Sequence, residues 1–220
     1  MFEVLKLNNI SCSINNILEG YKLTDESANP DAIILRSFSM HEYETGDRLL
    51  AVARAGAGVN NIPLTKMMEK GVVVFNTPGA NANAVKELVL CGMLLSCRDI
   101  LGGIAWVNSL PADENVPKTT EKGKANFGGT EIIGKTLGVI GAGAIGVLVA
   151  NMGITLGMKV LAHDPFLTEE NRARLSSKVE IACLEKIYSE CDFISLHAPL
   201  CPATRGMIDA TAIGKMKNCV

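Results

Sequence analysis

The chain has 220 residues, of which 48% are hydrophobic and 20% charged, enough to bury one sizeable core or two small ones. This composition excludes extended disorder and fibrous structure. Lys and Arg number 21 against 23 Asp and Glu, a formal charge of −2, which gives no global basic field for nucleic acid or anionic lipid. The N-terminus shows no basic segment followed by an apolar stretch, and no run of 18 apolar residues occurs, so neither export nor membrane insertion is expected.

The seven cysteines form an odd set without a C-x-x-C pair and without a His partner at metal-ligand spacing. We therefore expect reduced thiols, a cytoplasmic location and no metal site. The cysteines are Cys12, Cys91, Cys97, Cys183, Cys191, Cys201 and Cys219.

Short apolar runs alternate with helix-length amphipathic segments, which predicts an α/β fold with parallel sheets covered by helices. In the N-terminal part, Pro63 and Gly71 bound a predicted helix with Leu64, Met67 and Met68 on one face. The predicted strands of this part are residues 4–7, 32–35, 50–53 and 72–75.

A long apolar segment from residue 82 to about residue 104 predicts a helix buried between two bodies. The polar stretch 108–131 contains Pro111 and Pro117 and predicts a loop or linker. We place a domain boundary near residues 98–102, which gives a first domain of residues 1–98 and a second of residues 99–220.

The most specific motif follows this linker, where an apolar strand at 137–140 runs into Gly141-Ala-Gly143-Ala-Ile-Gly146 and then a helix. Gly141 allows a tight turn, Gly143 lets the backbone approach a pyrophosphate, and Gly146 lets helix and strand pack closely. The next strand ends at Asp164, whose carboxylate can accept hydrogen bonds from the adenosine ribose and would repel a 2′-phosphate. The motif thus predicts NAD rather than NADP. In the alternative interpretation, the glycines only permit packing and Asp164 only caps a turn.

Residues 191–200 predict another buried strand with His197, Ala198 and Pro199 at its carboxyl end. Open α/β sheets bind ligands at that edge, so we expect this loop to border the nicotinamide half of the cofactor.

Six segments together resemble the D-isomer-specific 2-hydroxyacid dehydrogenases. They are ILRSFSM from Ile34, RAGAGVNNIP from Arg54, VFNTPGANANAVKELVL from Val74, GKTLGVIGAGAIG from Gly134, HDPF from His163 and CDFISLHAPLCPATRGMI from Cys191. The resemblance implies a flavodoxin-like substrate-binding domain followed by a Rossmann, doubly wound NAD-binding domain that is incomplete at its C-terminal end.

The resemblance also implies roles for single residues. Arg36 and Ser37 match a pair that contacts a phosphorylated substrate, and Asn81 matches a further substrate contact; Gly56 and Gly58 match a turn whose backbone lies beside the substrate carboxylate. From the residues alone, Arg36 is equally a surface cation and Asn81 equally a helix N-cap. The implied cofactor contacts are Ala57, Gly141, Gly143, Ala144, Ile145, Gly146, Asp164, Ala198 and Pro199.

Two positions lie outside this set. Lys124 resembles a basic residue that reaches the site of a neighbouring subunit, as expected for a homodimer or higher homo-oligomer. Arg54 precedes the 56–58 turn and receives no role, because it can equally pair with an acidic neighbour or the linker.

The implied activity is the NAD-dependent oxidation of 3-phosphoglycerate to 3-phosphohydroxypyruvate, the first step of serine biosynthesis. One alternative is a reductase of another small 2-keto acid, such as glyoxylate or hydroxypyruvate, and another is a noncatalytic NAD-sensing module. The resemblance places the catalytic Arg, Glu and His beyond Val220, and we assign no catalytic role to His41, His163 or His197. We therefore expect a fragment that is inactive alone.

Overall fold

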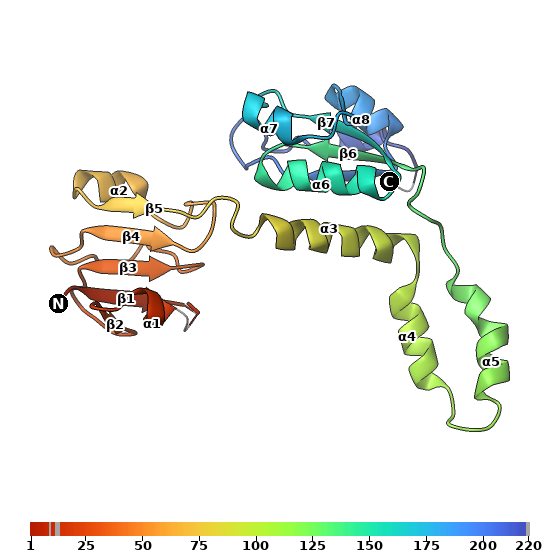
Figure 1. Cartoon of the computed structure of the whole chain (residues 1–220), viewed down its shortest axis with the longest axis horizontal. Helices are drawn as coiled ribbons and strands as arrows, with labels where there is room; N and C mark the ends of the chain where they lie inside the picture. Colours follow the sequence, from red (N-terminus) through yellow and green to blue (C-terminus); the bar gives the residue numbers. More distant parts are fainter. Residues whose placement is uncertain (9, 12–13, 219–220) are drawn as a thin grey trace. The chain divides into compact units, whose positions relative to one another are not determined.

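The chain forms two compact units, Met1–Asn81 and Ala82–Val220. The computed structural model describes residues 1–8, 10–11 and 14–218 (Figure 1). The division falls before the predicted boundary at residue 98, because helix α3 (Ala82–Cys97) packs along helix α6 (Ala144–Thr155) of the second unit. Met93 of α3 is buried in the same apolar cluster as Val149 of α6, which makes α3 part of the second unit.

The first unit is built on a parallel five-stranded sheet with the order β2-β1-β3-β4-β5. This is the flavodoxin-like order, so the predicted fold of this part is confirmed. Its elements are β1 (Glu3–Leu7), α1 (Ile14–Ile17), β2 (Lys22–Thr24), β3 (Ala32–Leu35), β4 (Ala51–Arg54), α2 (Leu64–Glu69) and β5 (Val73–Phe75).

The apolar runs of the first unit become strands because their side chains are buried in one core. Ile33 and Leu35 of β3, Val52 of β4 and Met67 of α2 are all at most 1% exposed. The predicted helix is confirmed as α2, and Gly71 follows it with φ +69°, a conformation that glycine adopts without strain.

The second unit is built on a parallel four-stranded sheet with the order β8-β7-β6-β9. Numbered from β6, this is the order 3-2-1-4 with which the doubly wound Rossmann sheet begins. The elements of this sheet and its helices are β6 (Thr136–Ile140), α6, β7 (Lys159–His163), α7 (Glu169–Arg174), β8 (Glu180–Ile181), α8 (Leu184–Glu190), β9 (Phe193–Leu196) and α9 (Ala210–Gly214).

The predicted single helix from residue 82 to residue 104 is in fact two helices, α3 and α4 (Ile100–Ser109). Asp99 starts α4, because its Oδ1 atom accepts a 2.9 Å hydrogen bond from the backbone N–H of Gly102. The carbonyl oxygen of Cys97, the last residue of α3, accepts a 3.1 Å hydrogen bond from the N–H of Thr130, which lies outside the helix. Within the second unit, α3 buries one face only, with Met93 6% exposed and Leu88 71% exposed.

The predicted linker is only partly irregular. Residues 116–127 form α5 (Val116–Gly123) and the 3-10 helix η1 (Lys124–Phe127). Pro117 lies in the first turn of α5, where its missing N–H leaves no helical hydrogen bond unmade. The Trp106 and Phe127 rings stack with centroids 5.2 Å apart, so α4 packs against η1. We call residues 99–128 the helical arm.

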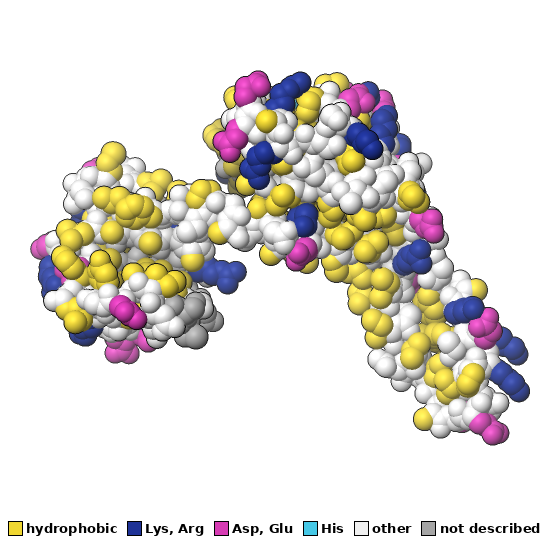
Figure 2. All heavy atoms as spheres, viewed as in Figure 1, with side chains coloured by type: hydrophobic (Ala, Val, Ile, Leu, Met, Phe, Trp, Pro, Cys, Tyr) yellow, Lys and Arg dark blue, Asp and Glu magenta, His cyan; other side chains and the backbone are white. Residues whose placement is uncertain are grey.

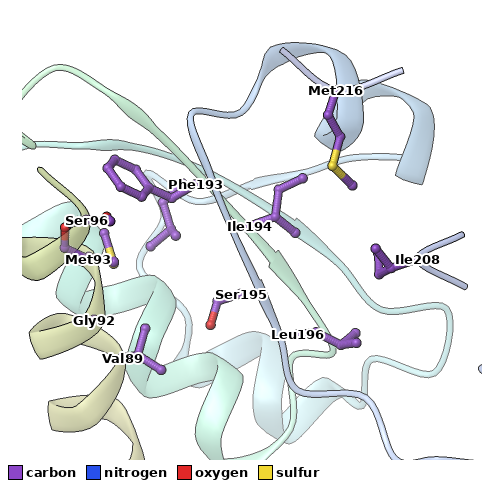
Figure 3. Close-up of a pocket in the computed structure, with 11 residues that line it drawn as sticks. Val89, Gly92, Met93, Ser96, Phe193, Ile194, Ser195, Leu196, Ile208 and Met216 are labelled. Carbon is purple, nitrogen blue, oxygen red and sulfur yellow. Dashed lines mark hydrogen bonds between the residues drawn. The ribbon is translucent and has the colours of Figure 1, made fainter. Parts of the chain in front are cut away.

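Strand β9 lies at the edge of its sheet and pairs with β6 alone among the described strands. A hollow of about 440 Å³ lies between β9 and α3 (Figure 3). Val89 and Met93 of α3 face Phe193 and Ser195 of β9 across it. The hollow contains no residue of the glycine loop, so it is separate from the predicted cofactor contacts.

Candidate functional site

The glycine loop joins β6 to α6, and each of its three glycines meets a different constraint. Gly141 has φ +90°, and a Cβ atom there would lie 2.7 Å from the Ala198 nitrogen. At Gly146 a Cβ atom would lie 1.8 Å from the carbonyl oxygen of Gly141. At Gly143 a Cβ atom would meet no described heavy atom within 4 Å. The fold therefore needs the first and third glycines, whereas Gly143 leaves open the side from which a pyrophosphate approaches.

Helix α6 starts at this loop with no side chain capping it. Gly143 is the N-cap residue, and Ala144 and Ile145 form the first turn. The first N–H groups of a helix have no partners within the helix and favour anions. The N-terminus of this 12-residue helix thus fits a phosphate group of a dinucleotide.

Asp164 connects the end of β7 to the glycine loop. Its Oδ2 atom accepts a 2.8 Å hydrogen bond from the N–H of Ala142, and its Oδ1 atom accepts a 2.9 Å bond from the N–H of Phe166. The carboxylate therefore does cap a turn, as the alternative interpretation held. A carboxylate has about four acceptor positions, so both oxygens can still accept from ribose hydroxyls.

The carboxyl end of β9 lies against the same loop. The N–H of His197 donates to the carbonyl oxygen of Ile140 over 2.7 Å, which sets Ala198 beside Gly141, and Pro199 follows in the chain. The predicted cofactor contacts of the second unit thus come from the carboxyl ends of three neighbouring strands, where open α/β sheets bind ligands.

The three histidines all make local hydrogen bonds. His197 Nε2 lies 2.8 Å from Ser195 Oγ, His163 Nδ1 lies 2.9 Å from the Ala182 carbonyl oxygen, and His41 Nε2 lies 2.9 Å from the Asn60 carbonyl oxygen. Burial lowers the pKa of the His197 imidazole, which favours the neutral ring. These surroundings give no support for a proton-donor role of His197.

In the first unit, the predicted substrate residues follow adjacent strands. Arg36 and Ser37 come directly after β3, and the 56–58 turn follows β4. Strands β3 and β4 are parallel, with Leu35 paired to Arg54, so these residues share the carboxyl edge of the sheet. Arg36 and Ser37 are exposed, and the Arg36 guanidinium has no hydrogen bond or ion pair with the described residues.

Arg54, which received no role from the sequence, holds this edge together. Its Nε atom donates to the Arg36 carbonyl oxygen over 3.0 Å, and its Nη1 atom donates to the Gly58 carbonyl oxygen. The only sequence signal for this function is an arginine at a strand end directly before a glycine turn.

The 56–58 turn is also held from the β5 side. Asn76 Nδ2 donates to the Ala57 carbonyl oxygen over 2.7 Å, and the Thr77 N–H donates to the Gly56 carbonyl oxygen over 3.0 Å. Asn81 directly precedes α3 and is exposed. Within the part of the chain that the structure describes, the Asn81 side chain makes no capping hydrogen bond, so the N-cap alternative gains no support.

Residues 1–8, 10–11 and 14–218 contain no group of three or more His, Cys, Asp or Glu side chains that could hold a metal ion. In these same ranges, no helix has the length and apolar character needed to cross a membrane. Cys91, Cys97, Cys183, Cys191 and Cys201 are free thiols, and Cys12 and Cys219 lie outside the described residues.

A glycine turn between a buried strand and a helix, an acidic residue at the end of the next strand and the strand order 3-2-1-4 together define a dinucleotide-binding domain of the Rossmann type. Residues 92–220 match the family model described as "D-isomer specific 2-hydroxyacid dehydrogenase, NAD binding domain". The chain belongs to the D-isomer specific 2-hydroxyacid dehydrogenase family. The predicted family, fold class and NAD cofactor are thereby confirmed.

Relatives of similar identity to this chain are named as different enzymes. A hydroxypyruvate reductase of Thermotoga maritima is 39% identical over 193 residues, which cover 86% of this chain and 58% of that protein. A D-3-phosphoglycerate dehydrogenase of Mycobacterium tuberculosis is 35% identical over 199 residues, 89% of this chain and 35% of that protein. The chain thus spans about a third to three fifths of the length of these relatives.

Among solved structures, an NAD⁺-bound 3-phosphoglycerate dehydrogenase of Entamoeba histolytica aligns with a TM-score of 0.71 and 26% identity. The alignment covers 98% of this chain and 68% of that one.

Proposed function

We propose that this chain is part of an NAD-dependent dehydrogenase that oxidises 3-phosphoglycerate to 3-phosphohydroxypyruvate, as in serine biosynthesis. The observation that carries the proposal is the exposed Arg36 guanidinium, which has no anionic partner among the described residues and stands beside Ser37 at the carboxyl edge of the first sheet. A guanidinium makes bidentate, charge-assisted hydrogen bonds to phosphate. The resemblance to D-3-phosphoglycerate dehydrogenases adds support.

The proposed roles follow from position in the two units. In the first, Arg36 and Ser37 bind the substrate phosphate, Asn81 adds a contact, and the backbone of Gly56 and Gly58 receives the carboxylate. The second unit binds NAD through the glycine loop (Gly141, Gly143, Ala144, Ile145 and Gly146) and through Asp164, Ala198 and Pro199, with Ala57 contributing from the first unit. When bound, NAD⁺ supplies the hydride acceptor.

Turnover also needs a group that accepts the hydroxyl proton. His41, His163 and His197 are each engaged in a local hydrogen bond, and we assign the proton to none of them. We accordingly propose that these 220 residues bind ligands but do not turn them over. Steady NADH oxidation with 3-phosphohydroxypyruvate by this chain would contradict that statement.

A second candidate is a reductase of hydroxypyruvate or glyoxylate, which the name of the Thermotoga maritima relative favours. The variant Arg36→Gln separates the two, with affinities measured by calorimetry in the presence of NADH. A lost charge-assisted contact should weaken 3-phosphoglycerate binding about 10- to 100-fold and hydroxypyruvate binding far less. Equal losses for both ligands would favour the second candidate. Arg172→Gln, on exposed α7, removes the same charge and serves as the control.

We also propose a homodimer or higher homo-oligomer, in the cytoplasm, in which a second copy covers the helical arm. Ile100, Leu101, Ile104 and Val107 of α4 are between 43% and 68% exposed, and Figure 2 shows apolar side chains gathered along α3 and α4. An apolar surface of this kind marks an interaction site. Lys124, the first residue of η1, pairs with Glu121 over 2.7 Å, and we propose that it reaches a neighbouring copy. Light scattering that gave only the monomer mass of 23.4 kDa would contradict this proposal.

A further inference from the structure

We infer that Asn61 is a positioning residue that fixes the loop carrying Arg36 and Ser37, and so sets the preference for a phosphorylated ligand. This inference rests on the proposed function, because it takes Arg36 as the phosphate contact. Asn61 lies beyond β4, in the RAGAGVNNIP segment, and the sequence assigned it no role of its own.

The Asn61 side chain holds the loop from one side. Its Nδ2 atom donates to the Phe38 carbonyl oxygen over 2.7 Å and to the Arg36 carbonyl oxygen over 3.3 Å. The Asn61 carbonyl oxygen accepts from the N–H of Met40 over 2.8 Å. One residue therefore fixes residues 36, 38 and 40, which bracket both predicted phosphate contacts.

The loop is held from the other side by Asn8, which follows β1. Its Oδ1 atom accepts hydrogen bonds from the N–H groups of Ser37, over 3.1 Å, and Phe38. The backbone donors of Ser37 and Phe38 are thus already used, so anion binding by this loop depends on the Arg36 and Ser37 side chains. Their placement then depends on the backbone that Asn61 holds.

The choice of an amide at position 61 supports a donor role. Asn61 is 9% exposed, and its Oδ1 atom is buried without a hydrogen-bond partner among the described residues. A buried acceptor without a partner is unfavourable, so the two Nδ2 hydrogen bonds must compensate for it. A carboxylate of the same shape would instead place an oxygen against two carbonyl oxygens.

The test uses Asn61→Ala and Asn61→Asp, with Asn60→Asp as the matched control. Asn60 is exposed, and its carbonyl oxygen, not its side chain, accepts from His41. Asn60→Asp therefore adds the same charge one residue away without removing a donor from the loop. Thermal unfolding of the whole chain and slow amide exchange in β3 and β4 establish that the first unit of each variant is folded, and retained NADH affinity establishes the same for the second unit.

The first readout is the ratio of the dissociation constants for D-glycerate and 3-phosphoglycerate, measured by calorimetry. We expect this preference for the phosphorylated acid to fall about tenfold in both Asn61 variants and less than about twofold in Asn60→Asp. A general loss of structure would weaken both ligands alike and leave the ratio unchanged. An unchanged ratio in Asn61 variants that still bind NADH overturns the inference.

The second readout needs no ligand. Ser37, Phe38 and Met40 keep their own hydrogen-bond acceptors in Asn61→Ala, but the loop loses its two bonds from Asn61 Nδ2 and opens more often. Amide hydrogen exchange at these three residues should therefore become about tenfold faster, while the β6 amides keep their rates. If the unmodified chain does not bind 3-phosphoglycerate, the proposed function fails. The amide hydrogen exchange rates of the loop then still decide whether Asn61 holds it in place. Unchanged exchange at these three amides overturns the inference, and so does faster exchange with an unchanged ligand ratio.

Discussion

The N–H of Ala142, in the glycine loop, donates a 2.8 Å hydrogen bond to the Oδ2 atom of Asp164, at the end of the neighbouring strand. The acidic residue thus orients the glycine loop, and in the proposed function it also presents acceptors to the ribose. The glycine loop and Asp164, which together predict the NAD site, are connected by this hydrogen bond. A change at Asp164 should therefore affect both the loop and the ribose contact.

The variant Asp164→Asn keeps one acceptor oxygen but loses the charge. We expect the dissociation constant for NADH to rise about 10- to 100-fold, because hydrogen bonds to a charged acceptor are lost. The preference for NADH over NADPH should fall, because the repulsion of a 2′-phosphate is removed. Fluorescence titration with both cofactors measures this. Glu170→Gln on exposed α7 is the control, and an unchanged NADH affinity in Asp164→Asn would count against the assignment.

The glycines allow a matched pair of variants. In Gly143→Ala the added methyl enters open space, so the melting temperature should hold while NADH affinity falls. In Gly146→Ala the methyl would lie 1.8 Å from the Gly141 carbonyl oxygen, so α6 must shift, at a cost of about 1–3 kcal/mol in the free energy of unfolding. Thermal unfolding and NADH titration of both variants check this. Equal stability losses in the two would be inconsistent with the loop geometry.

Much of the fold was predictable because its signals are local. Strands β1, β3, β4 and β5 lie within one residue of the predicted apolar runs, since buried parallel strands need continuous apolar residues. The glycine loop was equally predictable from the sequence, because the backbone geometry requires glycine at positions 141 and 146.

The errors arose where the decisive contact is distant in sequence. The apolar pattern resumes at Ile100 after Arg98 and Asp99, so the sequence suggests one helix, although an Asp before an apolar run is also a local N-cap signal. The bond from Thr130 to Cys97 at the end of α3 has no local signal. Pro117 was interpreted as a loop signal, although proline is compatible with a first helical turn. Arg54 and Asn61 act through carbonyl oxygens of the segment after β3, and such contacts leave no pattern in the sequence.

Trp106, the single tryptophan, reports on the helical arm. A Cβ atom at Gly123 would lie 2.2 Å from Trp106 Cζ2, so Gly123→Ala should displace the indole from its contact with Phe127 and shift its fluorescence emission to longer wavelength. Gly92→Ala on α3 adds a methyl where no described atom lies within 4 Å, and its spectrum should match that of the unmodified chain. An unshifted spectrum in Gly123→Ala would contradict the packing of the arm.

Cys191 should resist alkylation. Its side chain is fully buried with Ile187 and Tyr188, and burial raises the pKa of the thiol to about 12. Because the thiolate is the reactive form, only about one Cys191 in ten thousand is reactive at pH 8. Mass spectrometry after iodoacetamide treatment should find Cys91 and Cys183, which are exposed, labelled and Cys191 protected until urea is added. Helix α8 packs against β6, where Ile187 and Cys191 lie close to Gly138. Labelling of Cys191 at the rate of Cys91 would contradict this packing.

The most direct test of the account is a titration of this 220-residue chain with NADH and with NADPH, followed by cofactor fluorescence. The account predicts saturable NADH binding that weakens in Gly143→Ala, and weaker binding of NADPH. A chain that is folded by circular dichroism but binds neither cofactor, or that binds NADPH at least as tightly as NADH, would contradict the assignment of the glycine loop and Asp164 as the NAD site.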